Sequence, residues 1–484
     1  MDNPSLDPVD WEAFRRLAHQ VVDAGIDHTR DIRNRPVWQP MPPEVRAHFK
    51  APLPMAPRPL SEVVAALQRD LLPYPMGNIH PRFHAWYMGG SNPTGALADF
   101  LAAVVGSNLG GGDHAAAEID RQVVDWCRQM TGMPEGTSGT LVSGGSVANL
   151  VALTVARNVK AGVDVRIQGL QAAPPLRFYA SSQVHGCHIK AAEVLGLGRA
   201  GLRLIPAGPD CRMDIALLHQ AVAEDRAAGI RPACVIATAG TVNSGAVDDL
   251  PTLAAFCRNE DLWFHIDGCI GALVALGPRH RGLVRGIELG DSLALDPHKL
   301  LQAPFELGCC LVRDRDLHRA TFALNQEYLQ GTTRGLAAAE WLYDYGLQTS
   351  RGFRALKLWM SVMEQGAEHM GRMIDRTIDL AADLRARLSA AEGFDVMAGA
   401  GLNIVCFRHA GADEALRKAR NIETMLCLQD AGTAVLSDTT INGQHWLRAA
   451  YANHRTTEDD VATLVAALER RGEAALTQAI PVGV

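Results

Sequence analysis

The sequence predicts an α/β fold built on a mostly parallel sheet. Between about residues 94 and 311, short continuous apolar runs such as "PACVIATAG" and "LWFHIDGC" alternate with segments of helical periodicity. Continuous apolar runs are typical of strands that helices cover on both faces. The chain has 484 residues and is longer than a single hydrophobic core usually supports, so we expect smaller structural parts on either side of this domain.

The first 93 residues are predicted to form a helical and extended dimerisation segment. A first helix is expected from Pro8 to about Asp27, and eight of the 25 prolines then lie between Pro36 and Pro59. Proline lacks the amide hydrogen of a helix and clashes with the preceding turn. We therefore expect the proline-rich stretch to be a non-helical, extended arm.

The large α/β domain is expected to take residues 94–360. A helical tract from about Gly352 leads into the C-terminal part, where the strand-like run "LNIVCFRHA" precedes "HWLRAAYANHRTTEDDVATLVAAL". A short strand pattern followed by helical periodicity indicates a separate α+β domain, over residues 361–484.

Composition and charge exclude several classes of protein. The apolar fraction of 48% and the charged fraction of 20% are those of a globular protein, neither disordered nor membrane-embedded. The net charge of -7 comes without a basic block, which argues against nucleic acid or an anionic membrane as a partner. The N-terminus lacks an apolar signal region, and the ten cysteines include no C-x-x-C pair. Scattered cysteines are typical of reduced thiols, so we expect a cytoplasmic protein.

Four stretches at expected strand ends carry polar groups. In an open α/β sheet, ligands bind outside the carboxyl ends of the strands. The first stretch is "SGGSVANL", in which Gly144, Gly145 and Ser146 precede a helix. Glycines at a helix N-terminus let backbone N–H groups approach an anion, so this stretch could hold a phosphate. An ordinary Ser/Gly helix cap is the alternative.

The second and third stretches offer a carboxylate and an amine. "HIDG" ends a strand with Asp267, which could ligate a metal, hold a protonated ring nitrogen or simply cap the next helix. "SLALDPHKLL" places Lys299 between apolar residues. Burial favours the neutral form of an amine, which makes Lys299 a candidate nucleophile toward a carbonyl. A surface lysine at a strand edge is the alternative.

The fourth stretch, "SSQVHGCHIK", sets His185 and His188 three residues apart with Cys187 between them. A structural zinc site needs a second pair of ligands at suitable spacing, and none follows, so we expect no metal here. His185 could instead lie flat against an aromatic ring. An anion cradle, a carboxylate, a flat imidazole and an amine together match the needs of one cofactor, pyridoxal 5'-phosphate (PLP).

These stretches resemble those of the group II PLP-dependent amino acid decarboxylases of fold type I, especially the aromatic-L-amino-acid decarboxylase-like branch. The resemblance covers most of the chain, from "HPRFHAWYMGGSNP" through "DPHKLLQAPFELGCCLVRD" and "RGFRALKLWM" to "WLRAAYANHRTTEDDV". It implies a seven-stranded, mostly parallel sheet and a homodimer whose active site lies near the subunit interface, with the proline-rich arm laid across the other subunit.

The resemblance also implies roles for individual residues. Lys299 would bind the coenzyme's aldehyde, Asp267 would pair with its pyridine nitrogen, and His185 would stack on its ring. Gly145, Ser146 and His298 would contact the phosphate, and Cys269 would lie under the ring. Thr241 would lie beside His185. Trp86, Tyr87 and Gly89 would line the substrate pocket.

Two positions depart from the family pattern. The family associates protonation of the product carbon with a tyrosine on a mobile loop, and this position falls near Leu342, with Tyr343 and Tyr345 close by. Tyr343 is our predicted acid, with His185 as helper. Asp296 stands where the animal aromatic enzymes carry asparagine, which adds a carboxylate near the phosphate.

The expected reaction is decarboxylation of an L-amino acid to the amine and carbon dioxide. Trp86 and Tyr87 favour an aromatic or bulky apolar substrate, because an apolar pocket gains roughly 25 cal/mol per Å² of apolar surface covered. We identify no arginine that must lie in the pocket, so acidic substrates are disfavoured. One alternative is decarboxylation-dependent oxidative deamination to an aldehyde, because relatives that lose the tyrosine can divert the carbanion to oxygen. The others are a minor transamination activity and a non-catalytic relative.

Overall fold

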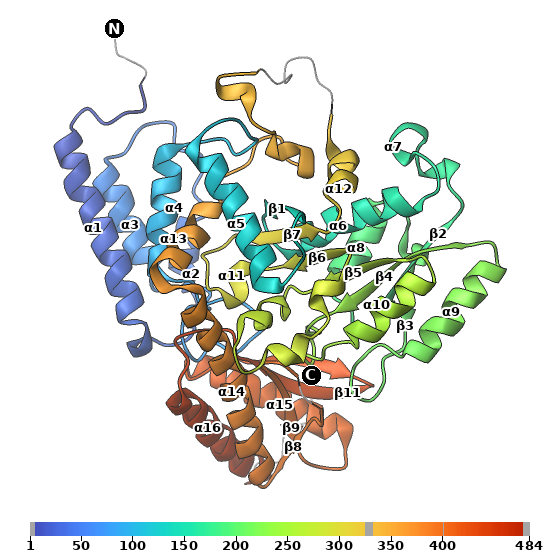
Figure 1. The fold of residues 1–484 in the computed structure, drawn as a ribbon. Coiled ribbons are helices and arrows are strands. Elements are labelled where there is room, and N and C mark those ends of the chain that lie inside the picture. The colour runs from blue at the N-terminus through green and yellow to red at the C-terminus, as the bar shows by residue number, and fades with distance from the viewer. Residues whose placement is uncertain (1–4, 325–332, 400, 478–484) are drawn as a thin grey trace.

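A seven-stranded sheet lies at the centre of the computed structural model, which describes residues 5–324, 333–399 and 401–477 (Figure 1). The strand order is β1-β7-β6-β5-β4-β2-β3. Among these strands of the described chain, β7 alone runs antiparallel to its neighbours, so the predicted mostly parallel seven-stranded sheet is confirmed. The strands are β1 Ser138–Val142, β2 Leu176–Ser181, β3 Leu202–Ile205, β4 Arg231–Thr238, β5 Trp263–Asp267, β6 Ser292–Leu295 and β7 Gly308–Val312.

Helices cover both faces of this sheet, as the continuous apolar runs predict. Every residue of β5, β6 and β7 is buried. Successive residues of β6 join two different apolar clusters: Leu293 packs on the side of α5 and α10, and Ala294 packs on the side of α6 and α8. The helices of this domain are α5 Ala115–Thr131, α6 Gly145–Lys160, α7 Val165–Gln168, α8 Cys187–Val194, α9 Ile215–Ala227, α10 Leu250–Asn259, α11 Pro297–Leu300, α12 Arg315–Phe322 and α13 Ala355–Gln365.

The N-terminal part is more helical than the sequence predicts. The first helix, α1 (Trp11–Arg30), begins three residues after Pro8 because the Asp10 side chain accepts the N–H groups that open it. The proline-rich stretch includes a short helix, α2 (Pro43–His48), so the prediction that it holds no helix is wrong. Pro43 occupies the first turn, where a missing N–H costs nothing. The remaining helices are α3 Leu60–Asp70 and α4 Pro93–Val105.

The C-terminal part is an antiparallel sheet covered by helices, and the α+β prediction is confirmed. Its four strands have the order β10-β11-β9-β8 and lie below the large sheet in the view of Figure 1. The boundaries expected after residues 93 and 360 stay predictions. The elements are α14 Ala367–Ala390, β8 Phe394–Val396, β9 Ile404–His409, α15 Glu414–Asp430, β10 Ser437–Ile441, β11 Gln444–Ala450 and α16 Glu458–Thr477.

A segment of the N-terminal part pairs with the C-terminal sheet region. Phe83 forms a parallel bridge with Val435, and the backbone of His84 bonds to Val435 and Ala450 at 2.8 and 2.9 Å. The Tyr87 hydroxyl then donates to Asn403 Oδ1 at 2.8 Å. These contacts hold residues 83–88 between the C-terminal sheet and the large domain, where residues 86–88 form part of the wall of a cavity.

Two general features bear on where the protein works. Within the described ranges, no helix has both the length and the apolar character that crossing a membrane requires. No disulfide joins the cysteines, all of which fall in those ranges.

A buried ion pair ties the chain after the 336–345 segment to the large domain. Arg351 Nη2 lies 3.3 Å from Asp120 Oδ1 on α5, and both side chains are almost fully buried. The guanidinium also donates to the carbonyl oxygens of Leu109 and Leu141, at 2.7 and 3.1 Å. Burial raises the pKa of Asp120, and Arg351 opposes this effect by stabilising the carboxylate.

We expect Arg351→Met to lower the stability of the fold by about 3–5 kcal/mol, because it leaves a buried carboxylate without its cation. The measurement is the urea midpoint of the apoprotein, compared with that of Arg387→Met. Arg387 pairs with Asp383 on the solvent face of α14, where screening makes the pair weak, so this control should leave the midpoint nearly unchanged. Equal midpoints for the two variants would contradict the assignment.

Candidate active site

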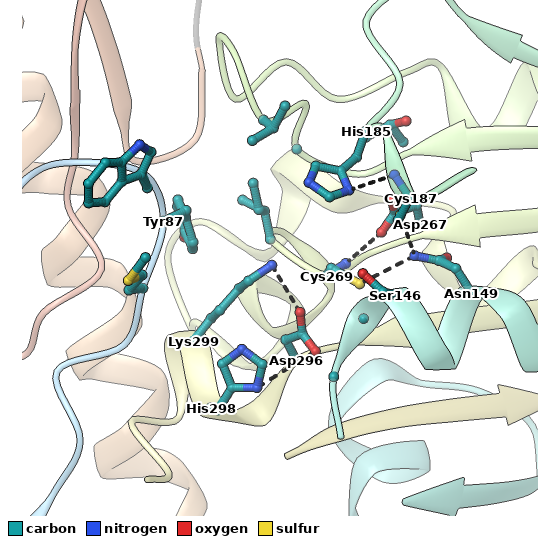
Figure 2. Close-up of a pocket in the computed structure, with 18 of the residues that line it drawn as sticks. Tyr87, Ser146, Asn149, His185, Cys187, Asp267, Cys269, Asp296, His298 and Lys299 are labelled. Carbon is teal, nitrogen blue, oxygen red and sulfur yellow. Dashed lines mark hydrogen bonds and ion pairs between the residues drawn. The ribbon is translucent and has the colours of Figure 1, made fainter. Parts of the chain in front are cut away.

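A cavity of about 580 Å³ opens at the carboxyl ends of the parallel strands (Figure 2). Because β1, β2, β4, β5 and β6 all run the same way, the turns that follow them meet at one edge of the sheet. The cavity is lined by these turns, by residues 86–88, and by three residues of the C-terminal sheet, Ser437, Asp438 and Arg448.

The N-terminus of α6 forms the floor of one end of the cavity. Ser143, Gly144, Gly145 and Ser146 line it, and the first N–H groups of the helix have no partner within the helix. A Cβ placed on Gly145 would lie 2.8 Å from Asp296 Oδ2 and still closer to Cys269 Sγ. The absent side chain therefore lets the helix backbone approach β5 and β6, and the N–H groups remain available for an anion.

Lys299 projects into the cavity from α11 and pairs with Asp296. Its Nζ lies 2.9 Å from Asp296 Oδ2 and 6.0 Å from the centre of the Tyr87 ring. Burial alone would lower the pKa of Lys299, but the carboxylate of Asp296, with smaller contributions from Cys269 and Asp267, holds it above its usual value. Desolvation favours the neutral amine, as expected, but in the chain without coenzyme the partner carboxylate outweighs this effect.

Asp267 ends β5 and faces the same cavity. Its Oδ2 lies 2.8 Å from His188 Nε2, and its Oδ1 accepts the backbone N–H of Cys269 at 3.2 Å. Burial alone would raise the pKa of Asp267, but the bond and the charge of His188 hold it well below its usual range. The residue is an anion held in one orientation, as a partner for a protonated ring nitrogen must be.

His185 and Cys269 lie on either side of the space next to Asp267. The His185 ring projects into the cavity from the turn before α8, and its Nδ1 accepts the N–H of Cys187 at 3.2 Å (Figure 2). Cys269 lines the opposite wall beside Gly145. Burial raises the pKa of Cys269 well above its usual value, so the thiol stays protonated.

His298 lies between the α6 N-terminus and Phe305. Its Nδ1 donates to the carbonyl of Leu307 at 2.6 Å, and its ring centre is 4.6 Å from that of Phe305. Burial lowers the pKa of His298, so the ring is neutral in the chain alone. A bound phosphate dianion would favour its protonation and turn Nε2 into a donor.

The N-terminal segment supplies the apolar wall. Trp86 and Tyr87 line the cavity as predicted, and Met88 joins them. Gly89 does not line it. A Cβ on Gly89 would collide with the carbonyl of His298 and lie 2.8 Å from that of Lys299, so this glycine lets the segment pack directly on the lysine turn.

Two more predicted residues, besides Gly89, lie outside the cavity lining. Thr241 Oγ1 bonds to Ser244 Oγ at 2.9 Å and accepts the N–H of Ala246, so it closes a loop instead of facing His185. The neighbours of Thr241, Gly240 and Val242, line the cavity in its place.

Tyr343 does not reach the cavity either. It is buried in the 3₁₀ turn η9 (Leu342–Tyr345), and its ring centre is 5.5 Å from that of Trp341. Tyr345 bonds to Glu340 and Arg315, again away from the lining. Among the described residues, Tyr87 is the one tyrosine that lines the cavity.

Two further polar residues of the site carry no recognisable signal in the sequence. Asn149, one turn after Gly145, lines the cavity and accepts from His265 Nε2 at 2.7 Å. Arg448 on β11 also lines it, an arginine whose place in the pocket the sequence did not require. Arg448 donates to the carbonyls of Trp86 and Asn243 at 2.5 and 3.2 Å, and burial lowers its pKa to about 10.

Asp267, which is expected to bind a cofactor, also belongs to a group of side chains that could bind a metal ion. Donor atoms of Cys187, His188 and Asp267 lie within 4.8 Å of one another, as in a partial metal site. Structural zinc takes four ligands, and His188 and Asp267 are already bonded to each other. PLP fits the whole set better: an N-terminal glycine cradle for its phosphate, an ionised carboxylate for its ring nitrogen, and an amine for its aldehyde.

Comparison with known proteins agrees with this fit. A family profile described as "Pyridoxal-dependent decarboxylase conserved domain" matches residues 42–410. An aromatic-L-amino-acid decarboxylase of Bacillus atrophaeus is 33% identical to the chain and aligns over 96% of both proteins. A phenylacetaldehyde synthase of Arabidopsis thaliana is 28% identical over 95% of this chain and 96% of the relative.

The fold is similar to that of solved structures in the same group. The structure of Oryza sativa TDC with PLP and tryptamine superposes with a TM-score of 0.89 at 25% identity. The match covers 97% of this chain and 99% of the solved one.

We expect Gly145→Ala to weaken PLP binding by at least about tenfold, because the new methyl group would push the α6 N-terminus away from Cys269 and Asp296. The affinity is measured by titrating the apoprotein with PLP. The matched control is Gly25→Ala on α1, where a Cβ meets no atom within 4 Å and the affinity should not change. Unchanged affinity in folded Gly145→Ala would show that the cradle does not hold the phosphate.

Proposed function

Because the chain belongs to the pyridoxal-dependent decarboxylase family, we propose that it converts an L-amino acid with an aromatic or bulky apolar side chain to the amine and carbon dioxide. It is an enzyme that uses PLP. The observation that carries the proposal is that the amine of Lys299 and the carboxylate of Asp267 face one cavity, at whose edge α6 begins.

Bound PLP supplies an electron-accepting ring, which takes up the electron pair left when the substrate carboxylate departs as carbon dioxide. The N-terminus of α6, with Gly145 and Ser146, would bind the phosphate. Lys299 would bind the aldehyde, and Cys269 and His185 would cover the two faces of the ring. Asp267, held as an anion, would keep a proton on the pyridine nitrogen, because a nearby negative charge favours the protonated ring.

Asp296 is placed to control the proton of Lys299. An ammonium cannot attack an aldehyde, so Lys299 must lose a proton from Nζ before it reacts. Asp296 Oδ2 at 2.9 Å is the nearest carboxylate to that proton. We assign Asp296 the role of accepting or sharing it, which gives a function to the carboxylate that departs from the family pattern.

The cavity wall supports the proposed substrate class. Trp86, Tyr87, Met88, Val242, Ile270 and Phe305 form its apolar part. A flat or bulky apolar side chain would cover this surface and exclude water from the reacting carbon. Arg448 is engaged by backbone carbonyls, but its presence makes acidic amino acids a necessary part of any substrate test.

An aldehyde-forming reaction is the second candidate. Tyr343, the proposed acid, is buried away from the cavity lining, which leaves His185 as the histidine nearest to the expected position of the substrate. Without a strong acid at this position, the site would protonate the product carbon slowly, which would favour the reaction with oxygen over formation of the amine. A relative of this chain is named a phenylacetaldehyde synthase, so the scaffold is compatible with that outcome.

We further propose a homodimer in the cytoplasm. Helix α4 exposes five large apolar side chains in the single chain, more than a monomer of this kind leaves in water. They are Leu97, Phe100, Leu101, Val104 and Val105. The cysteines, none of which forms a disulfide within the described chain, support a reducing compartment.

We expect purified holoenzyme to release carbon dioxide and the corresponding amine from aromatic L-amino acids, with no oxygen consumption. A panel of aromatic, branched aliphatic and acidic L-amino acids is tested while carbon dioxide, oxygen and product mass are recorded. Oxygen uptake with aldehyde, ammonia and peroxide would establish the second candidate instead.

The control for this experiment is Lys299→Ala, which should lose turnover by several orders of magnitude and lose the reducible link to PLP. Borohydride reduction of the wild type, followed by digestion, should place a pyridoxyl group on Lys299. A label on another residue, or full turnover in the variant, would remove the chemical basis of the proposal.

We expect the wild type to be a dimer and Phe100→Asp combined with Val104→Asp to dissociate it, because two carboxylates would be buried in an apolar interface. Light scattering after size-exclusion chromatography over a range of concentrations gives the mass. Ile167→Asp is the control: Ile167 is exposed on the short helix α7, so its replacement should leave the mass unchanged. A wild type that stays monomeric would contradict the proposal.

A further inference from the structure

We propose that His188 is a positioning residue for the coenzyme: it holds Asp267 ionised and in one orientation, and so keeps the proton on the pyridine nitrogen. The inference rests on the proposed function and adds to it a residue that does not line the cavity. It concerns the second histidine of "HGCH", which the motif left without a role.

The contact between His188 and Asp267 is direct and excluded from solvent. His188 is the second residue of α8, its side chain is fully buried, and its Nε2 lies 2.8 Å from Asp267 Oδ2. The other carboxylate oxygen accepts the N–H of Cys269. With each oxygen bonded on a different side, the carboxylate cannot rotate, and its remaining lone pairs face the cavity that Asp267 lines.

Packing alone does not account for a histidine at this position. His188 Nδ1 is buried and makes no hydrogen bond to the part of the chain that the structure describes. A buried nitrogen without a partner costs stability that an apolar side chain of similar size would not. The contact that the imidazole gains in return is the one to Asp267.

The charges around His188 favour its protonated form. Cys187 and Asp267 face it, and the ring of His265 lies 6.2 Å away and is neutral, because burial lowers its pKa to about 3. Burial would also lower the pKa of His188, but the charges and hydrogen bonds of Cys187 and Asp267 outweigh it and raise the pKa to about 10. On the cavity side, the ionisable groups that interact with Asp267 are Cys269, His185 and Lys299.

The charge of His188 determines how strongly Asp267 can stabilise a protonated ring nitrogen in the coenzyme. While His188 is a cation, Asp267 stays an anion at neutral pH and can stabilise a protonated pyridine nitrogen. Without His188, the buried carboxylate keeps only the Cys269 N–H, and desolvation raises its pKa toward neutrality. A neutral carboxyl group attracts the ring cation far less, so both PLP affinity and the electron demand of the ring should fall.

The test compares His188→Leu and His188→Gln with the wild type. Each apoprotein is titrated with PLP and with a PLP analogue in which carbon replaces the ring nitrogen. We expect His188→Leu to bind PLP at least about tenfold more weakly, which corresponds to roughly 1.4 kcal/mol, and to bind the analogue as the wild type does. In turnover, kcat should fall while KM changes little. His188→Gln, whose amide can still donate to Asp267, should recover part of the loss.

His409→Leu is the matched control. His409 is also a buried histidine with one side-chain partner, Thr424 Oγ1 at 2.8 Å, but it lies on β9 outside the cavity lining. Its replacement should lower stability without changing PLP affinity.

The outcomes separate this inference from the proposed function. Equal weakening for PLP and the analogue would mean that His188 is only a spacer, and unchanged PLP affinity and kcat in folded His188→Leu would overturn the inference. Both results leave the borohydride label on Lys299 in place. Loss of that label in the wild type would instead overturn the proposed function.

Discussion

The close approach of the α6 N-terminus to strands β5 and β6 is the constraint on which the site depends. Gly145 has no side chain, so the helix backbone lies directly against Cys269 and Asp296. Gly308 on β7 permits the same approach from the other side, next to the backbone of Gly144. Parallel pairing of β5 and β6 then places a carboxylate and an amine, Asp267 and Lys299, beside the first N–H groups of the helix.

The site is organised as two buried pairs of opposite charge. Lys299 with Asp296 and His188 with Asp267 each place a basic nitrogen within 3 Å of a carboxylate oxygen. Burying such pairs brings little net stability, because desolvation offsets most of the attraction. In the proposed function, the first pair would set the proton of the reacting amine, and the second would hold the anion that faces the ring nitrogen. Functional sites commonly retain such arrangements at a cost to the fold.

Much of the fold and the site could be predicted because the chemistry lies at strand ends that the sequence marks clearly. Lys299, Asp267, His185 and the Gly145 turn line one cavity, since parallel strands deliver their carboxyl ends to one edge. Arg448 could not be predicted, because a strand 149 residues after Lys299 brings it there only through tertiary packing. The Thr241 hydroxyl bonds to Ser244 and Ala246 within its own loop, which no sequence motif indicates. The charge on Lys299 depends on its distance from Asp296, which no motif specifies either.

The wall formed by residues 83–88 has a consequence for how this enzyme can diverge. Its backbone is held by Val435 and Ala450, at the margins of the small sheet, whereas the groups that would hold the cofactor all follow strands of the large one. Trp86, Tyr87 and Met88 are thus encoded in a stretch of the sequence separate from the groups that would hold the cofactor. Substitutions in that stretch would reshape part of the apolar wall and leave the groups around Lys299 unchanged.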